Sequence, residues 1–173
     1  MLTVLVSNFN TFTQAFYNSI IESLDLALLS CTCGHSGCLS IHGYYTRSVI
    51  TPAGKITLTI CRVKCSECGH THALLLSSMV PYSQIPAEDQ RLIAEAYESG
   101  SKRNDLCSPD SGIDENNIKS VIRCYVKFWR ERLIAARIRL ESLTDLVTVC
   151  FRDYSKQFMQ IRSTRNILFT PPT

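Results

Sequence analysis

The residues of this sequence with the clearest chemical potential are its nine cysteines. Five of them form two clusters, with Cys31, Cys33 and Cys38 in the first and Cys65 and Cys68 in the second. Thiolates are good zinc ligands, and closely spaced pairs are typical of zinc sites in proteins without a secretion signal. The two-residue spacing between Cys65 and Cys68 lets both sulfur atoms reach one ion. The clusters therefore predict a Zn²⁺ site.

The first cluster offers three thiols where a tetrahedral site still needs two ligands. Cys31 can pair with Cys33, or Cys33 with Cys38 across a wider loop, and the spacing alone does not choose between these pairs. All three therefore stay candidates, together with Cys65 and Cys68. A site made only of thiolates keeps no position open for a substrate, so we expect a structural metal and not a catalytic one.

Other cysteines and histidines near the clusters are interpreted as packed or solvated side chains. Cys61 lies within an expected strand, where a thiol is more often a small buried residue than a ligand. A histidine could replace a thiolate, but the clusters contain enough thiols without one. The four histidines of the sequence are His35, His42, His70 and His72.

The residues between the two clusters predict a β-hairpin. Residues 39–50 are rich in strand-forming side chains, residues 51–55 contain turn residues, and residues 55–63 alternate with a period of two. A third strand is expected at 71–76. A sheet this small buries too little apolar surface to be stable alone, and a metal that joins its loops compensates for this. The pattern is that of a zinc ribbon over residues 31–80.

The residues after the hairpin predict a helix-turn-helix domain. A first helix ends at Gly100, and a short helix is expected at 101–107. A turn follows at 108–112, and Asp114 can cap a long helix that reaches about Leu140. Helix, short helix, turn and long helix is the order found in helix-turn-helix domains.

The long helix carries a basic face. Between Lys119 and Arg139 there are seven basic residues and one acid, Glu131. Several of the basic side chains fall on one side of a helix with 100° between residues. Lysine and arginine neutralise phosphates, and asparagines in the first turn can pair with adenine. The expected DNA contacts are Asn116, Asn117, Lys119, Ser120, Arg123, Lys127 and Arg130.

Length and composition set the wider frame. The chain has 173 residues, of which 45% are apolar, and a formal net charge of +3 that permits nucleic-acid binding without implying it. We expect an α+β fold in four parts. These are a strand and helix at 1–30, the zinc ribbon at 31–80, the helix-turn-helix domain at 81–140, and a helix with an extended tail at 141–173.

The two ends of the chain predict one helix each. Apolar residues recur every four positions from Phe12 to Leu28, which favours a helix from about Thr11 to Leu29. The last helix is expected over 143–159. No apolar run is long enough to span a membrane and the first residues carry no signal peptide, so we expect a cytoplasmic protein, nucleoid-associated when bound to DNA.

Several motifs occur in a fixed order along the chain. They are Cys-x-Cys-Gly-His-Ser-Gly from Cys31, His-Gly-Tyr-Tyr-Thr-Arg from His42, Cys-Ser-Glu-Cys-Gly-His-Thr-His from Cys65 and Val-Pro-Tyr-Ser from Val80. Together they resemble a bacterial family of zinc-ribbon proteins of unknown function, which is similar to the N-terminal DNA-binding region of insertion-sequence transposases. The resemblance implies that the ribbon and the helix-turn-helix bind the ends of a mobile element, and it favours Cys31 with Cys33.

The sequence predicts a DNA-binding protein and not an enzyme. It shows no Ser/His/Asp set, phosphate loop or His-Glu-x-x-His motif, and no counterpart of the ribonuclease-H-like domain that the resembled transposases carry. The expected partners are double-stranded DNA and a separately encoded transposase, and a homodimer would suit a palindromic site. The alternatives are a protein adaptor that uses the ribbon and the tail 167–173, and, more weakly, an RNA binder that stacks bases on Tyr44 and Tyr45.

Overall fold

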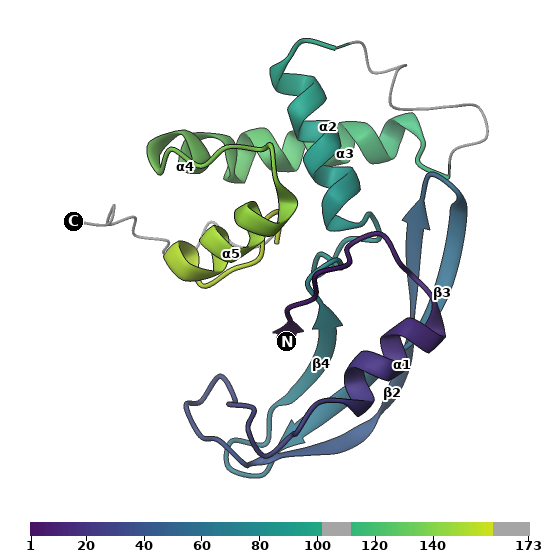
Figure 1. The fold of residues 1–173 in the computed structure, drawn as a ribbon, viewed down its shortest axis with the longest axis vertical. Helices are drawn as coiled ribbons and strands as arrows, with labels where there is room; N and C mark the ends of the chain where they lie inside the picture. Colours follow the sequence, from purple (N-terminus) through teal and green to yellow (C-terminus); the bar gives the residue numbers. More distant parts are fainter. Residues whose placement is uncertain (102–111, 161–173) are drawn as a thin grey trace. The chain divides into compact units, whose positions relative to one another are not determined.

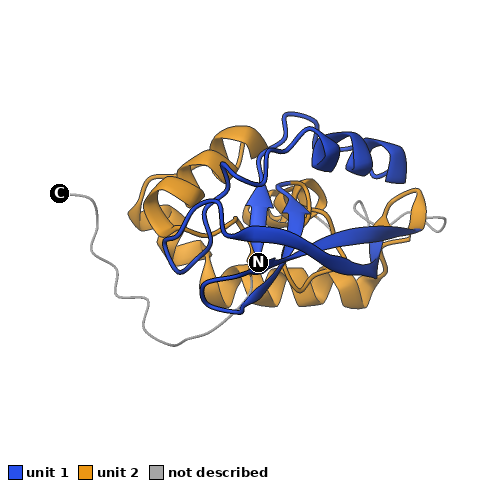
Figure 2. Ribbon diagram, turned by 90° about the horizontal axis from the view of Figure 1, so that it is seen from below, with its two compact units in different colours: residues 1–49, 56–77 blue, residues 50–55, 78–173 orange. Residues whose placement is uncertain are grey.

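The computed structural model describes residues 1–101 and 112–160 and has the element order of an α+β protein (Figure 1). The strands come from the first half of the chain and most of the helices from the second half, as the sequence predicts. Contacts divide the chain into two compact units (Figure 2). The first unit comprises residues 1–49 and 56–77, and the second comprises residues 50–55 and 78–173.

The first unit is built on a four-stranded sheet. Its strands are β1 (Leu2–Val4), β2 (Leu39–Thr51), β3 (Gly54–Cys65) and β4 (Thr71–Leu76), in the spatial order β1-β4-β3-β2. β2 and β3 form the predicted hairpin, whose tip at 50–55 is grouped with the second unit. β4 runs antiparallel to β3, and β1 runs parallel to β4. The hairpin and the strand at 71–76 are thereby confirmed.

The helix of the first unit is shorter than predicted. α1 spans Gln14–Glu22 rather than residues 11–29, and Thr13 caps its start by accepting a hydrogen bond from the N–H of Phe16. Beyond its end, the Asp25 carboxylate accepts the Ala27 N–H, a local bond that competes with helix formation. The expected apolar face is confirmed only in part, because Phe12 is buried whereas Leu28 is 78% exposed, and the buried side chain of α1 itself is Tyr17.

Four helices form the described part of the second unit. They are α2 (Ala87–Glu98), α3 (Glu115–Phe128), α4 (Arg130–Ala135) and α5 (Leu143–Tyr154), with α2 packed against α3 and α5, and α3 against α4. Asp114 caps α3 as predicted, because its Oδ1 accepts the Asn117 N–H at 2.7 Å. The predicted end of α2 at Gly100 is also confirmed, since Ser99 closes the helix.

The prediction of one long helix that reaches Leu140 is wrong. α3 ends at Phe128, and the backbone leaves helical geometry at Trp129, where φ is −121°. The Trp129 ring is 1% exposed and packs edge-on against Tyr154 and Phe158, so tertiary packing overrides the local helical pattern.

The short helix α4 is closed by backbone hydrogen bonds. The N–H of Ile138 donates to the carbonyl of Leu133 at 2.8 Å, and the N–H of Arg137 donates to that of Ile134 at 3.0 Å. Arg137 has a φ of 54°, and these two bonds form the Schellman arrangement that ends helices. Arg137 therefore lies beyond the helix and does not extend its basic face.

The last helix also ends early. α5 stops at Tyr154 rather than Met159, because Ser155 takes the left-handed conformation with φ of 52°. Phe158 and Met159 are fully buried after this turn. The expected short helix at 101–107, apart from Ser101, and the tail at 167–173 lie outside the described residues. No helix in the described ranges is both long and apolar enough to cross a membrane.

Candidate functional site

Four cysteines converge in the first unit. The sulfur atoms of Cys31, Cys33, Cys65 and Cys68 all lie within 4.8 Å of one another. The Sγ–Sγ distance is 3.6 Å between Cys31 and Cys68 and 3.8 Å between Cys33 and Cys65. A tetrahedral site with metal–sulfur distances of about 2.3 Å has sulfur atoms about 3.8 Å apart. These four side chains could therefore hold one metal ion.

Two tight turns present the sulfur atoms. The N–H of Cys31 donates to the His35 carbonyl at 2.8 Å, and the N–H of Cys65 donates to the His70 carbonyl at 3.0 Å. The first turn precedes β2, and the second joins β3 to β4. Gly69 closes the second turn with a φ of 72°, which glycine adopts without steric cost. The hairpin between the turns brings both cysteine pairs to the same end of the sheet.

Backbone N–H groups favour the thiolate form at two of the four cysteines. The N–H of Cys33 lowers the pKa of Cys31 to about 7. The N–H of Cys68 lies 3.5 Å from the sulfur of Cys65 and lowers the pKa of Cys65 to about 6. The thiolate is the form that binds a metal, so the turns prepare these sulfur atoms for a cation.

Cys38 lies beside this group but outside it. Its sulfur is 3.4 Å from that of Cys65, and its thiol donates to the His35 carbonyl at 3.2 Å. Burial and the neighbouring Cys65 raise the pKa of Cys38 to about 11, which keeps it a neutral thiol. Of the two pairings open from the sequence, the structure brings Cys31 and Cys33 together with the second cluster.

His72 is packed, one of the two states expected for the histidines near the clusters, and it makes a contact with Cys31 that the sequence interpretation did not foresee. Its ring is 4% exposed, and Nε2 lies 3.3 Å from the sulfur of Cys31. An N–H that donates to a metal-bound thiolate orients that ligand. The signal was present in the alternation of β4, because His72 shares its side of the strand with the buried Leu74 and Leu76. Cys61 is 1% exposed and is a packed residue, as predicted.

The solvent side of α3 carries most of the residues predicted to contact DNA. Asn117 is half-buried in the first turn, and Arg130 is the half-buried first residue of α4. The exposed members of the predicted set, all on α3, are Asn116, Lys119, Ser120, Arg123 and Lys127.

Carboxylates neutralise part of this basic surface. Lys119 pairs with Glu115 at 2.8 Å, and Arg130 pairs with Glu98 at 2.7 Å. Arg123 and Lys127 form no ion pair with any carboxylate of the described residues. The Lys127 ammonium lies 5.1 Å from the centre of the Phe128 ring, in a cation–π contact that does not neutralise its charge. The unpaired positive charge of α3 is therefore concentrated at these two side chains.

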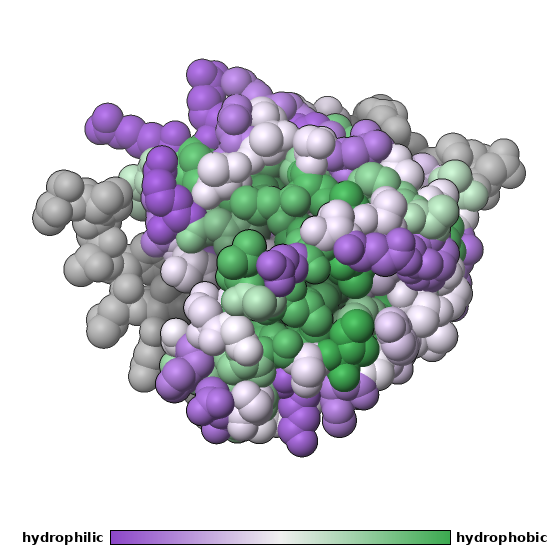
Figure 3. All heavy atoms as spheres, turned by 60° about the horizontal axis from the view of Figure 1, so that its bottom comes forward, coloured by the Kyte–Doolittle hydropathy of each residue, from purple (hydrophilic) through white to green (hydrophobic). Residues whose placement is uncertain are grey.

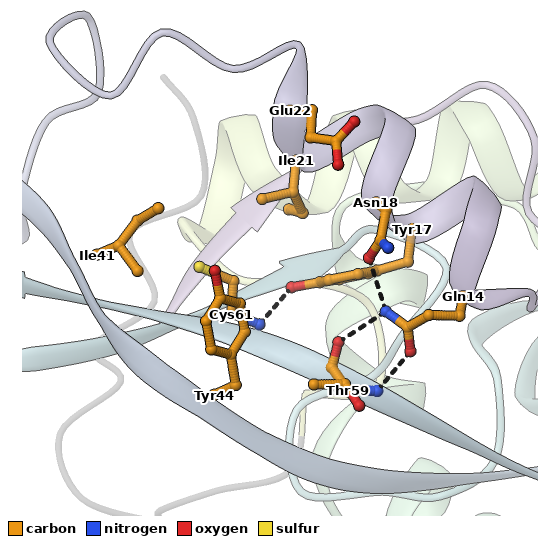
Figure 4. Close-up of a pocket in the computed structure, with 9 residues that line it drawn as sticks. All are labelled: Gln14, Tyr17, Asn18, Ile21, Glu22, Ile41, Tyr44, Thr59 and Cys61. Atoms are coloured by element: carbon orange, nitrogen blue, oxygen red, sulfur yellow. Dashed lines mark hydrogen bonds between the residues drawn. The ribbon is translucent and has the colours of Figure 1, made fainter.

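A groove of about 530 Å³ lies between α1 and the hairpin (Figure 4). Ile21 of α1 and Ile41 and Tyr44 of β2 point into it. Ile41 is 56% exposed and Tyr44 is 61% exposed, so the groove is open to solvent. Among the described residues that line it, Glu22 is the only charged one, and this absence of basic side chains disfavours a nucleic acid as its ligand.

Apolar side chains also reach the surface elsewhere. Figure 3 shows a face on which they gather between hydrophilic ones. Besides the groove residues, strongly exposed apolar side chains in the described ranges include Leu5, Leu28, Tyr82 and Ile134.

Comparison with known proteins finds a family model that matches part of the chain. A family model described as a domain of unknown function (DUF6431) matches residues 30–113, which include all four converging cysteines, the hairpin and α2. The chain is similar to this domain over that range. No curated protein and no solved structure matches the chain.

Proposed function

We propose that this protein binds duplex DNA through α3 and that a structural Zn²⁺ ion stabilises the sheet of its first unit. The observation that carries the proposal is the exposed face of α3, which combines hydrogen-bonding side chains in its first turns with unpaired cations further along. The DNA-binding surface and the metal site lie in different units, so we assign them different roles.

The exposed residues of α3 form a stripe that suits a DNA groove. Asn116, Ser120, Arg123 and Lys127 follow one another at intervals of four, three and four residues, which keeps them on one side of a helix. Arg123 and Lys127 would contact phosphates, and Asn116 would meet base edges from the start of the helix. The opposite side of α3 is occupied by the core, since Ile118, Val121, Ile122 and Tyr125 are buried.

Zinc is the metal that the site fits best. Four thiolate-forming side chains at tetrahedral spacing suit Zn²⁺, whereas Mg²⁺ and Ca²⁺ prefer oxygen ligands. Cys31, Cys33, Cys65 and Cys68 would hold the ion, and its binding would join the loop before β2 to the turn after β3. With four sulfur ligands the ion keeps no open position, so its contribution is to stability.

The resemblance of the cysteine and hairpin motifs to mobile-element proteins supports a biological context. In that context α3 would recognise the ends of an element or a promoter within it. A separately encoded transposase would then be brought to the DNA by this protein. This context is supported by the resemblance alone.

Selection from a random duplex library tests the DNA-binding proposal. We expect the zinc-loaded full chain to enrich a sequence motif. A double variant, Arg123→Ala with Lys127→Ala, should lose most of the recovered DNA, whereas Arg139→Ala with Lys156→Ala removes the same charge outside α3 and should not. The absence of any enrichment by folded, zinc-loaded protein would reject the proposal.

A quadruple Cys31/Cys33/Cys65/Cys68→Ser variant tests the zinc role in the same selection. We expect this variant to bind no zinc and to lose the enriched motif if the metal-stabilised unit is needed for recognition. Normal enrichment without zinc would show that α3 acts independently of the metal.

A protein adaptor is the second candidate function, and the groove beside α1 favours it. Apolar Ile41 and Tyr44, with Glu22 as the single charge, suit a neutral or basic peptide better than DNA. Substituting Tyr44→Asp and Ile41→Asp should abolish capture of a partner protein and leave DNA selection unchanged if the adaptor role is correct. The opposite outcome, loss of DNA selection alone, would remove the reason for assigning the groove to a protein.

A further inference from the structure

The tip of the β2–β3 hairpin lies directly against the backbone that leads into α3. The N–H of Gly112 donates to the carbonyl of Pro52 at 3.3 Å. A Cβ atom on Gly112 would lie 2.6 Å from the carbonyl oxygen of Thr51 and 2.9 Å from the Cα of Gly54. Backbone therefore touches backbone here, three residues before α3 begins, and all of these residues belong to the second unit.

Further hydrogen bonds hold the tip in place. The hydroxyl of Thr51 donates to the carbonyl of Gly54 at 3.0 Å, which closes the turn. The N–H of Ile50 donates to the carbonyl of Gln84, in the segment before α2, at 2.8 Å. The tip is thus fixed both to the entry of α2 and to the entry of α3. Figure 1 shows the tip beside the start of α3.

The tip presents one cation and two small residues to solvent. Pro52, Ala53 and Lys55 are exposed, and Lys55 forms no ion pair with a carboxylate of the described residues. The acids at the start of α3 have other contacts, since Asp114 accepts the Asn117 N–H and Glu115 pairs with Lys119. An ammonium without an ion pair among the described residues therefore lies on the element next to the helix end that carries Asn116.

We propose that the hairpin tip, residues 50–55, is a second DNA-contacting element in which Lys55 binds a backbone phosphate beside the base pairs that α3 meets. The inference rests on the proposed DNA binding by α3 and adds a second point of attachment to it. Contacts to phosphates position a protein on the duplex, and a contact on a rigid turn beside the helix would fix how α3 enters the groove. Lysine suits this role because its ammonium acts as a point charge on a flexible stem.

Salt-dependent binding of Lys55→Ala tests the inference. The probe is a fluorescein-labelled random-sequence duplex, titrated with the zinc-loaded full chain at several potassium chloride concentrations. Loss of one phosphate contact should lower the slope of log affinity against log salt by about 0.9 and weaken binding about equally for all duplex sequences. Lys64→Ala is the matched control, because Lys64 is an exposed lysine of β3 outside the tip.

The outcomes separate the inference from the function on which it rests. A reduced slope in Lys55→Ala and an unchanged slope in Lys64→Ala support the hairpin contact. Normal binding and slope in Lys55→Ala, or equal losses in both variants, overturn the inference and leave DNA binding by α3 intact. If the unsubstituted chain does not bind the duplex, both proposals fail. Circular dichroism checks that Lys55→Ala is folded, as expected for an exposed side chain.

Discussion

The hydroxyl of Tyr17 lies between the backbones of β3 and β4. It accepts a hydrogen bond from the N–H of Cys61 at 2.8 Å and donates one to the carbonyl of Leu74 at 2.9 Å. Arg62 pairs with Ala73 at the end of the backbone ladder between β3 and β4, and the same register would place Cys61 opposite Leu74. The Tyr17 phenol therefore bridges the two strands at the point where their backbone pairing stops. Burial raises the pKa of Tyr17 well above its usual range, which keeps the hydroxyl a donor.

Gln14 of α1 bonds the backbone of β3 in a similar way, two residues before Cys61. Its side-chain amide donates to the carbonyl of Thr59 at 3.0 Å and accepts the N–H of Thr59 at 2.7 Å (Figure 4). Two side chains of α1 thus bond backbone groups of β3 that β4 no longer reaches. The N–H of Cys61 is buried, so leaving it without a partner would be costly, whereas the groups of Thr59 are exposed. This explains why α1 is attached to the sheet by polar as well as apolar contacts.

Replacing Tyr17 by phenylalanine should destabilise the first unit. The N–H of Cys61 and the carbonyl of Leu74 would both lose their partner in a buried position, at a cost of about 1–3 kcal/mol. Urea unfolding of the zinc-loaded chain measures the change. Tyr44→Phe, on an exposed tyrosine, is the control and should change stability by less than about 0.5 kcal/mol. Equal stability of the two variants would show that the bridge contributes nothing.

Serine substitution of Cys33 and Cys38 should separate a ligand from its neighbour. Cys33 belongs to the four converging sulfur atoms and Cys38 does not. Losing a residue that only hydrogen-bonds a metal ligand weakens metal binding by about 10- to 100-fold, and we expect Cys33→Ser to weaken zinc binding by more than this. We expect Cys38→Ser to keep about one Zn²⁺ per chain. Competition with a chromogenic chelator measures both. Zinc loss in Cys38→Ser alone would reverse the assignment of ligands.

The sheet was the part of the fold most open to prediction, because its signals are local. Alternation along residues 55–63 and the turn residues Pro52 and Gly54 specify a hairpin without reference to the rest of the chain. The convergence of the two cysteine clusters follows from that hairpin. The choice between Cys33 and Cys38 as neighbours of Cys31 depends on turn geometry, which spacing alone does not define.

The start of α3 and the end of α2 follow local signals and were predicted, but the ends of α1, α3 and α5 were not. Repeated apolar residues selected Phe12 and Leu28, but the side chain that anchors α1 is Tyr17, which acts through its hydroxyl. The helical pattern continues through Trp129, yet its packing against Tyr154 bends the backbone there. The contacts of Tyr17 and Trp129 join residues far apart in the sequence, so local periodicity does not reveal them.

Replacing Arg91 by methionine should destabilise the second unit. Its guanidinium is 9% exposed, pairs with Glu88 and Glu95 at 2.7 Å, and donates to the carbonyl of Leu140 at 2.7 Å. Removing one partner of a buried ion pair costs about 3–5 kcal/mol, and the partly exposed Glu95 places this case at the lower end. Thermal unfolding measures the loss.

A matched substitution on the surface controls for the loss of charge. Arg139 pairs with Glu141 at 2.8 Å, but its side chain is 79% exposed. Arg139→Met should therefore change stability by no more than about 0.5 kcal/mol. If both methionine variants lose the same stability, net charge and not the buried contacts of Arg91 sets the effect.

Replacing Gly112 by alanine should disturb the contact between the hairpin tip and the entry of α3. The added methyl would meet the Thr51 carbonyl oxygen at 2.6 Å, and backbone on both sides leaves little room to adjust. Overpacking of this kind costs about 1–3 kcal/mol. Hydrogen exchange should show faster exchange at the N–H of Ile50 and in the first turn of α3. Ala53→Ser, at the exposed end of the tip, should leave both unchanged.

Asp89 in the first turn of α2 should make the stability of the second unit depend on pH. Burial, with a smaller effect of Glu88, raises the pKa of Asp89 to about 6. The Asp89 carboxyl of the unfolded chain has a pKa of about 3.9. Between about pH 4 and pH 6, the folded state therefore holds a proton at Asp89 that the unfolded chain has released. The stability gained from this proton is complete below about pH 4 and is lost as the pH rises through 6, because the charged carboxylate is then partly buried.

Asparagine at this position should remove the cost of the charge. At pH 7 we expect Asp89→Asn to be more stable than the unsubstituted chain by about 1 kcal/mol, a figure that allows for solvent screening of a partly exposed group. Near pH 4 we expect the two chains to be equally stable. Asp145→Asn is the control, since Asp145 is an exposed acid at the equivalent third position of α5 and should give no such gain. Urea unfolding at several pH values measures both. Lower stability of Asp89→Asn at pH 7 would mean that attraction between the carboxylate and the start of α2 outweighs the cost of its burial.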